Sequence, residues 1–145
     1  MLRTVRLNLE TPERVLKMAI SEQIEMRPVY IDFSTRYSIE FDDFTLHQQG
    51  ICYRVHRGAN VISILPDLTV WDYYSLRGLG DTMFFRDLDT SKAIMIYAYS
   101  HMEGGETLMS RGRQKEGIAE LRLAEKMVPQ LKAQIETTLS GFGKK

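Results

Sequence analysis

The chain has 145 residues, of which 43% are hydrophobic and 26% charged, and its 19 basic residues balance 19 acidic ones. These values are typical of one folded domain with a sizeable core, and they exclude a disordered chain. The net charge of zero lacks the basic excess of most nucleic-acid binders, so we expect any nucleic-acid contact to be incidental. It also leaves self-association unopposed by charge repulsion.

The single cysteine, Cys52, excludes an intrachain disulfide and a cysteine-based zinc cluster. We interpret it as a small buried apolar side chain rather than a reactive thiol. No run approaches the roughly 18 apolar residues of a membrane span, and the first residues lack the apolar segment of a signal peptide. We therefore expect a protein that is cytoplasmic when synthesised and has no membrane partner.

The N-terminal part is predicted to contain one strand and one helix. Loose alternation over 2–9 predicts a half-buried strand. Thr11-Pro12-Glu13 then combines an N-cap, a proline at the first helical position and an early acidic residue, which predicts a helix to about Glu25. Pro28 prevents this helix from continuing.

The next part, 29–65, is predicted to form a mostly antiparallel sheet. Its alternating and β-branched residues give strands at 29–33, around 39–46, at 51–56 and at 61–65. The apolar phase switches at Asp42–Asp43, which indicates a bulge or a tight turn. Hairpins are expected at 47–50, where Gly50 is free to adopt a positive φ, and at 57–60.

The region 66–87 is the least regular. Its glycine-rich stretch 75–81 is interpreted as a loop rather than a phosphate cradle, because no helix with a Lys-Ser/Thr pair follows. Residues 83–85 are a candidate short strand. The same region holds Trp71, Tyr73 and Tyr74, which form either a lid over the core or a contact patch.

The last third is predicted to be helical. Asp89-Thr90-Ser91 is a capping sequence, and we expect a buried helix over 93–102, with a strand as the competing interpretation. The Gly104–Gly105 pair predicts a break, followed by a charged helix to the C-terminus. That helix carries an apolar stripe near a seven-residue repeat, and Pro129 is expected to kink it. The stripe consists of Ile118, Leu121, Ala124, Val128, Leu131, Ile135 and Leu139.

Together these elements predict a single α+β domain over 1–145. It comprises a mostly antiparallel sheet with one N-terminal helix, over 2–88, and a C-terminal helical pair, over 89–142.

No catalytic, cofactor or metal site is predicted. The three histidines, His47, His56 and His101, lack the close spacing of zinc ligands. Asp42 and Asp43 would face opposite sides of a strand, and no Gly-x-Ser-x-Gly sequence is present. The chain is therefore expected to be non-catalytic and to need no cofactor.

The candidate functional residues are instead interface residues. Aromatic side chains are enriched at the centres of protein interfaces, and basic residues on a helix can meet an acidic face, although a solvated helix side explains the basic residues better. The charged helix supplies apolar positions for assembly. The candidates are Trp71, Tyr73, Tyr74, Arg77, Arg111, Arg113, Leu131 and Ile135.

Three segments of the C-terminal part carry a resemblance. They are the apolar stretch Leu88–Tyr99, then Gly104-Gly105-Glu106, then the charged stretch Glu116–Lys126. In this part the chain resembles the head–tail connector, or neck adaptor, proteins of tailed bacteriophages, although it begins with a strand and one helix where such adaptors have a helix pair. The resemblance implies a ring-forming virion protein without catalytic activity.

The leading hypothesis is a structural protein that assembles with itself and with other proteins of a larger complex. The alternative is a small-molecule-binding or enzymatic domain with a pocket near the 71–81 loop, which would use Tyr53, Arg54, His56 and Asp81. A third hypothesis is a small inhibitor that binds a host protein through the aromatic residues of that loop.

Overall fold

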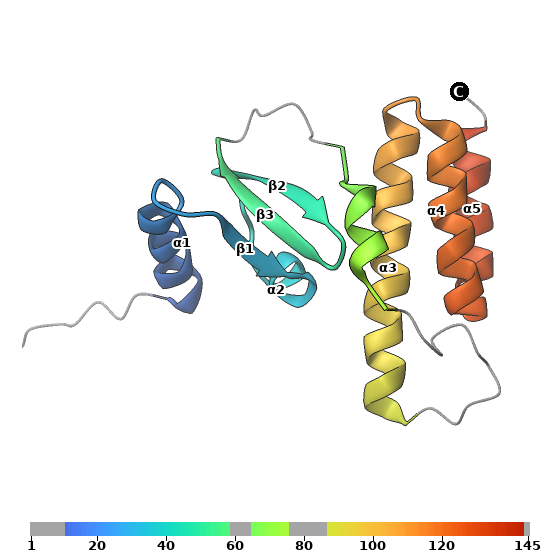
Figure 1. Ribbon diagram of the computed structural model, residues 1–145, viewed down its shortest axis with the longest axis horizontal. Helices are drawn as coiled ribbons and strands as arrows, with labels where there is room; N and C mark the ends of the chain where they lie inside the picture. Colours follow the sequence, from blue (N-terminus) through green and yellow to red (C-terminus); the bar gives the residue numbers. More distant parts are fainter. Residues whose placement is uncertain (1–10, 59–64, 76–86, 144–145) are drawn as a thin grey trace, which may run out of the picture.

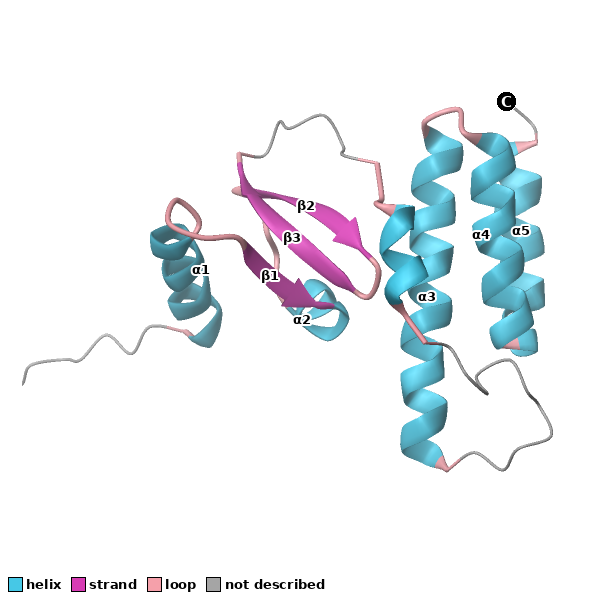
Figure 2. Cartoon of the chain, viewed as in Figure 1, coloured by secondary structure: helices cyan, strands magenta, loops and turns pink. Residues whose placement is uncertain are grey.

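The computed structural model describes residues 11–58, 65–75 and 87–143, and these form an α+β fold (Figures 1 and 2). A small antiparallel sheet with short helices lies beside a bundle of longer helices. The predicted strands over 2–9 and 83–85 lie outside the described residues. So does most of the predicted strand 61–65, and the second half of the hairpin at 57–60.

Helix α1, Pro12–Gln23, begins as predicted. The Thr11 side chain accepts a hydrogen bond from the Arg14 backbone N–H at 3.3 Å, and Pro12 occupies the first helical position. Ile20 is the buried residue of this helix. Large apolar side chains at Val15 and Met18 are about half exposed, so α1 is only partly covered by the rest of the chain.

Three strands form the sheet: β1 (Val29–Asp32), β2 (Phe44–Gln49) and β3 (Cys52–Arg57), in the order β1-β3-β2. Both pairings are antiparallel, as predicted. The β2–β3 hairpin turns at Gly50, whose φ of 65° confirms the need for glycine there. A Cβ at Gly50 would also lie 2.9 Å from the Tyr74 ring, so the turn packs directly against that side chain.

Residues 33–38 were predicted to be extended, and this was wrong. Helix α2 spans Phe33–Ser38, because the Asp32 carboxylate caps it by accepting from the Thr35 backbone N–H at 2.6 Å. Local capping outweighs the β propensity of this stretch. Phe41 is buried beside Phe44, and a turn at residues 42–43 accounts for the apolar phase switch there.

The helix predicted at 93–102 is confirmed, but it is much longer. Helix α3 spans Leu88–Ser110, and its N-cap is Asp87, whose carboxylate accepts from the Thr90 backbone N–H at 2.7 Å. The predicted break at Gly104–Gly105 was wrong, since α3 continues through both glycines. The break comes instead at Gly112, which adopts a φ of 81°.

The two glycines are sites of close packing. A Cβ at Gly105 would lie 2.8 Å from the Gly117 carbonyl oxygen, and a Cβ at Gly117 would lie 2.6 Å from the Gly105 carbonyl oxygen. Gly117 belongs to helix α4, Gln114–Met127, which packs antiparallel to α3 (Figure 1). Gly104 faces the sheet, with the Gln48 side-chain oxygen 3.2 Å from a Cβ placed there. Glycine therefore occupies positions 104 and 105 of α3 because it is small, and not because its backbone is flexible.

The prediction that Pro129 kinks a continuous helix was also wrong. Helix α4 ends at Met127, a short 3-10 turn η2 (Pro129–Leu131) follows, and the chain reverses into α5 (Lys132–Phe142) (Figure 1). The apolar stripe therefore folds back on itself. Leu131 and Ile135 are buried in the bundle, so both belong to the core of a single chain rather than to an exposed seam.

The buried hydrophobic residues form two clusters with no member in common among the described residues. One lies within the helical bundle and includes Ile94, Leu121 and Ile135. The other lies between the sheet, α1 and α2, and includes Ile20, Phe44 and Val55. We call the three-stranded sheet together with α1 and α2 the β module. Within the described residues, no helix is both long and apolar enough to cross a lipid bilayer.

The close approach of α3 and α4 gives a first testable prediction. Gly117→Ala should destabilise the fold by about 1–3 kcal/mol, because the added methyl group meets backbone atoms that cannot move independently. Gly141→Ala in α5 is the matched control. Nothing lies within 4 Å of its Cβ, so alanine should be neutral or stabilise by about 0.5–1 kcal/mol. Urea unfolding of both variants measures the difference, and equal stabilities would contradict the close approach.

Candidate functional site

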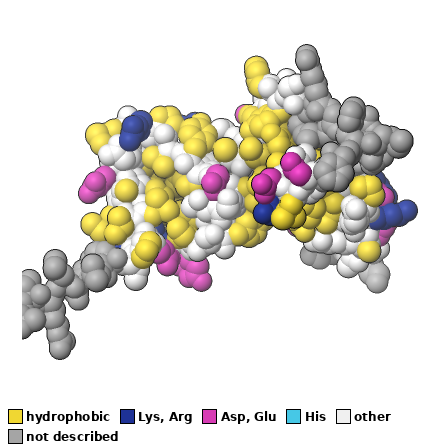
Figure 3. Space-filling model, turned by 90° about the horizontal axis from the view of Figure 1, so that it is seen from below, with side chains coloured by type: hydrophobic (Ala, Val, Ile, Leu, Met, Phe, Trp, Pro, Cys, Tyr) yellow, Lys and Arg dark blue, Asp and Glu magenta, His cyan; other side chains and the backbone are white. Residues whose placement is uncertain are grey.

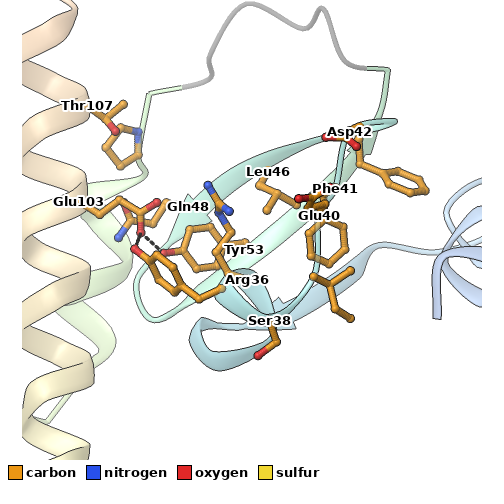
Figure 4. Close-up of a pocket in the computed structure, with 14 residues that line it drawn as sticks. Arg36, Ser38, Glu40, Phe41, Asp42, Leu46, Gln48, Tyr53, Glu103 and Thr107 are labelled. Carbon is orange, nitrogen blue, oxygen red and sulfur yellow. Dashed lines mark hydrogen bonds between the residues drawn. The ribbon is translucent and has the colours of Figure 1, made fainter. Parts of the chain in front are cut away.

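A cavity of about 790 Å³ lies between the β module and helix α3 (Figure 4). The sheet and α2 supply one side, and α3 supplies the other. Its size is in the range of small-molecule sites, which are commonly about 300–1,000 Å³. The lining residues are Arg36, Tyr37, Ser38, Ile39, Glu40, Phe41, Asp42, Phe44, Leu46, Gln48, Tyr53, Pro66, Glu103 and Thr107.

The carboxylate of Glu103 is the centre of the cavity wall formed by α3. The hydroxyl group of Tyr37 donates to its Oε2 atom at 3.2 Å, and the hydroxyl group of Tyr53 donates to the same atom (Figure 4). Tyr53 is buried on β3, whereas Tyr37 on α2 is 63% exposed. Two elements of the β module thus converge on one carboxylate of the bundle.

The two phenols hold their protons more strongly than free tyrosine does. Burial of the Tyr53 hydroxyl raises its pKa, and the hydrogen bond to Glu103 and the negative charge there raise it further. The pKa of Tyr37 is raised to about 12, by burial of its hydroxyl end first and then by the charge of Glu103 and the hydrogen bond to it. Both hydroxyls are therefore donors to Glu103 at neutral pH.

The Gln48 side chain on β2 joins the cavity wall to helix α3 through a hydrogen bond. Its side-chain Nε2 donates to the Ser100 carbonyl oxygen at 2.7 Å and to the Gly50 carbonyl oxygen at 3.3 Å. The residue is 8% exposed, so these bonds satisfy an amide that would be costly to bury unpaired. They attach the hairpin to the helix.

The cavity is chemically mixed. Aromatic and aliphatic side chains, including Phe41, Phe44 and Leu46, form a smaller part of its wall than polar groups do. Three carboxylates line it, those of Glu40, Asp42 and Glu103, against the single guanidinium of Arg36. Asp42 lies at the far end of the cavity from Glu103 (Figure 4). The lining therefore carries an excess of negative charge.

A second polar cluster is closed to solvent. His101 Nδ1 lies 2.7 Å from Glu120 Oε2, and the two residues are 2% and 7% exposed. The Trp71 ring stacks on His101 with centroids 4.1 Å apart. Trp71 comes from the 3-10 helix η1, Leu68–Tyr73, so the cluster joins η1, α3 and α4. Its position in the interior suits a structural role.

The aromatic interface candidates divide into two kinds. Tyr73 is 88% exposed, whereas Trp71 and Tyr74 are partly buried and contact each other and Tyr97. Trp71 and Tyr74 therefore act as a lid against α3, and Tyr73 alone of the three is free for a partner. Arg77 lies outside the described residues.

The other interface candidates are placed as follows. Arg111 and Arg113 are exposed at the α3–α4 turn, where Arg113 Nε pairs with Glu116 Oε1 at 2.9 Å. Leu131 and Ile135 are core residues of the bundle. Cys52 is partly buried, and burial raises the pKa of its thiol, which disfavours the reactive thiolate.

Of the pocket residues expected near the 71–81 loop, the three that are described lie in two different hollows. Tyr53 faces the cavity, but Arg54 and His56 do not line it. Asp81 lies outside the described residues. His47 and His56 become neighbours on the sheet, with ring centroids 6.0 Å apart. Among the described residues, no group of three or more histidine, cysteine and acidic side chains could hold a metal ion.

Sequence reasoning missed Tyr37, Gln48 and Glu103 as cavity residues. Glu103 lies 66 residues from Tyr37 and 50 from Tyr53 in the chain, so no local motif links them. Gln48 does carry a weak signal. It sits in the inward phase of β2 with Phe44 and Leu46, where a polar side chain needs a partner.

No known protein family, no curated protein and no solved structure matches this chain. The resemblance to phage head–tail connector proteins remains a prediction. Functional inference therefore depends on the geometry of the described residues.

The tyrosine–glutamate cluster gives a second prediction. The raised pKa of Tyr37 should contribute stability that is full below pH 10 and is lost as pH rises toward about 12. In an ultraviolet titration of the phenols, Glu103→Gln should move the latest-titrating tyrosines to lower pH, because it removes the negative charge beside them. Glu136→Gln on α5 should leave the titration unchanged, and an equal shift in both variants would contradict the assignment.

The interior cluster gives a third prediction. Glu120→Ala should cost about 2–4 kcal/mol, because it leaves the buried His101 ring without the carboxylate partner at Nδ1. Glu136→Ala is the control, since its ion pair with Arg122 is about half exposed and screened by water. Thermal unfolding should separate the two variants clearly. Similar melting temperatures would show that the buried pair contributes little.

Proposed function

We propose that the protein is a non-catalytic subunit of a homo-oligomeric, ring-like assembly. A neck or connector complex of a tailed bacteriophage is the example that the sequence resemblance suggests. The observation that supports the proposal is a concentration of exposed hydrophobic side chains on the N-terminal elements.

Nine large hydrophobic residues in the described part of the chain are 40% or more exposed, and five of them lie between positions 15 and 37. These five are Val15 (53%), Met18 (51%), Met26 (71%), Tyr30 (50%) and Tyr37 (63%). Hydrophobic side chains are interspersed with polar ones over the end of the molecule that carries α1 (Figure 3). Tyr37 lies apart from this end, against Glu103 of α3. We call these five residues the N-terminal patch.

Scattered apolar residues are normal on a protein surface, but their concentration on one segment favours a contact site. Burying apolar surface yields about 25 cal/mol per Å². The patch contains two methionines and two tyrosines, and both residue types are enriched at interfaces. The patch therefore has the composition expected of a surface that is covered in an assembly.

A second copy of the chain is the partner that we favour. The net charge is zero, so identical copies meet without long-range repulsion. Helix α1 lies at the end of the molecule opposite the bundle (Figure 1). A contact from this end to another surface of the next copy is of the head-to-tail kind that builds rings.

Small-molecule binding is the second candidate function, and the cavity beside Glu103 favours it. The two functions are compatible, because Tyr37 alone of the N-terminal patch lines that cavity. An inhibitor of a host protein would also use the N-terminal patch or Tyr73 for its contact. It would differ from an assembly subunit in being a monomer when the host protein is absent.

The assembly proposal predicts a concentration-dependent mass in solution. Light scattering over a dilution series should show an oligomer for the natural protein. The double variant Val15→Glu with Met18→Glu should shift it toward monomer, because two charges would be buried in the contact. Leu123→Glu is the control, since Leu123 is similarly exposed at 41% but lies on α4.

A strict monomer at the highest concentration would contradict self-assembly. Equal loss of mass in the double variant and the Leu123→Glu control would contradict the placement of the contact at α1. Circular dichroism of each variant shows whether the fold is retained. We expect it to be retained, since both substituted α1 positions are already half exposed.

A further inference from the structure

We propose that the cavity between α2, the β2–β3 hairpin and α3 binds an organic cation, with a guanidinium or alkylammonium group held beside the Glu103 carboxylate. This goes beyond the assembly function and does not depend on it.

The hydrogen bonds of Glu103 leave it able to bind a cation. Both tyrosine hydroxyls donate to its Oε2 atom, and neither neutralises its charge. Among the described residues, no lysine, arginine or histidine nitrogen lies within ion-pair distance of Glu103. A carboxylate has room for about four hydrogen bonds, so a cationic donor can still bind. The cavity wall therefore presents an anchored carboxylate that has no cationic partner among the described residues.

The side chains that line the cavity carry a net negative charge. Glu40, Asp42 and Glu103 outnumber Arg36 by three to one, so an anion would be repelled. A bare metal ion is a poor fit, because no metal-holding cluster exists among the described residues. Positive charge spread over an organic group suits a site with one anchored carboxylate and two more distant ones.

Part of the cavity wall is aromatic. Phe41, Phe44 and Tyr37 line the cavity, and aromatic faces attract cations, most strongly where water is excluded. The Arg36 guanidinium already lies 5.6 Å from the centroid of the Tyr37 ring. This contact shows that a guanidinium can be accommodated at the cavity mouth. It also makes Arg36 a competitor for any cationic ligand.

Polar groups of the cavity wall are held in place before any ligand binds. Tyr53 is 2% exposed and Gln48 8% exposed, and both are hydrogen-bonded to α3, Tyr53 through Glu103 and Gln48 through the Ser100 carbonyl oxygen. A ligand would meet groups that are already fixed, so little conformational entropy is lost on binding. With a volume of about 790 Å³, the cavity has room for a linear cation of several carbon atoms.

The test uses agmatine, which carries a guanidinium and an ammonium group on a four-carbon chain. Isothermal titration calorimetry of the full chain should show saturable binding. The matched probe 4-guanidinobutanoate, in which a carboxylate replaces the ammonium end, should bind at least several-fold more weakly. Glu103→Gln should weaken agmatine binding by about tenfold or more, because a charge-assisted hydrogen bond is lost.

Two further variants distinguish a specific loss of binding from a loss of the fold. Arg36→Gln removes the competing cation and should tighten binding about two- to fivefold at low ionic strength, a gain that misfolding cannot produce. Glu136→Gln on α5 lies outside the cavity and should leave the affinity unchanged.

The source of the cation is decided by one more probe, arginine blocked at both its amino and carboxyl ends. Tighter binding of blocked arginine than of agmatine would assign the cavity to a basic side chain of a polypeptide. Tighter binding of agmatine would assign it to a free polyamine-like molecule. Either result supports the proposal. Absence of binding for both at 10 mM, or equal binding of the 4-guanidinobutanoate probe, would overturn it.

Discussion

Polar and aromatic contacts along α3 join two hydrophobic cores into one fold. The hydrophobic cluster of the β module and that of the bundle share no described residue. The Phe33 ring of α2 stacks on the Tyr99 ring of α3 with centroids 6.4 Å apart. Gln48, donating to the Ser100 carbonyl oxygen, and the tyrosines, donating to Glu103, supply directional contacts between the β module and the bundle. Hydrogen bonds fix geometry better than apolar contacts do, and they leave a solvent-accessible cavity beside them.

The same contacts give the protein both of its candidate surfaces. Tyr37 lies in the cavity wall and in the N-terminal patch, with its hydroxyl on Glu103 and 63% of its surface exposed. An occupant of either site would alter the surroundings of this one side chain. Assembly and ligand binding can therefore be coupled without a large conformational change, provided that each binding step has a different affinity for the two arrangements of Tyr37.

The sequence was a good guide where one residue decides a local structure. The helix start at Thr11-Pro12 and the turn at Gly50 depend on capping and on a positive φ, and both were predicted. It was a poor guide where the reason is tertiary. Gly104 and Gly105 reflect close packing against Gln48 and Gly117 rather than a helix break. Pro129 marks a reversal into α5, because the stripe packs against its own chain. The cavity joins residues 50 or more positions apart, which periodicity cannot reveal.

The order of the elements along the chain has a consequence for synthesis. Tyr53 precedes Glu103 by 50 residues, so the β module emerges from the ribosome roughly 3–10 seconds before its partner carboxylate at usual elongation rates. During that interval the hydroxyls of Tyr37 and Tyr53 lack Glu103, and the Gln48 amide lacks the Ser100 carbonyl oxygen. The bundle, by contrast, is contiguous from Leu88 to Phe142 and is built from antiparallel neighbours, an arrangement that favours rapid folding. Because both parts line the cavity, it can form only after α3 has been synthesised and lies against the β module.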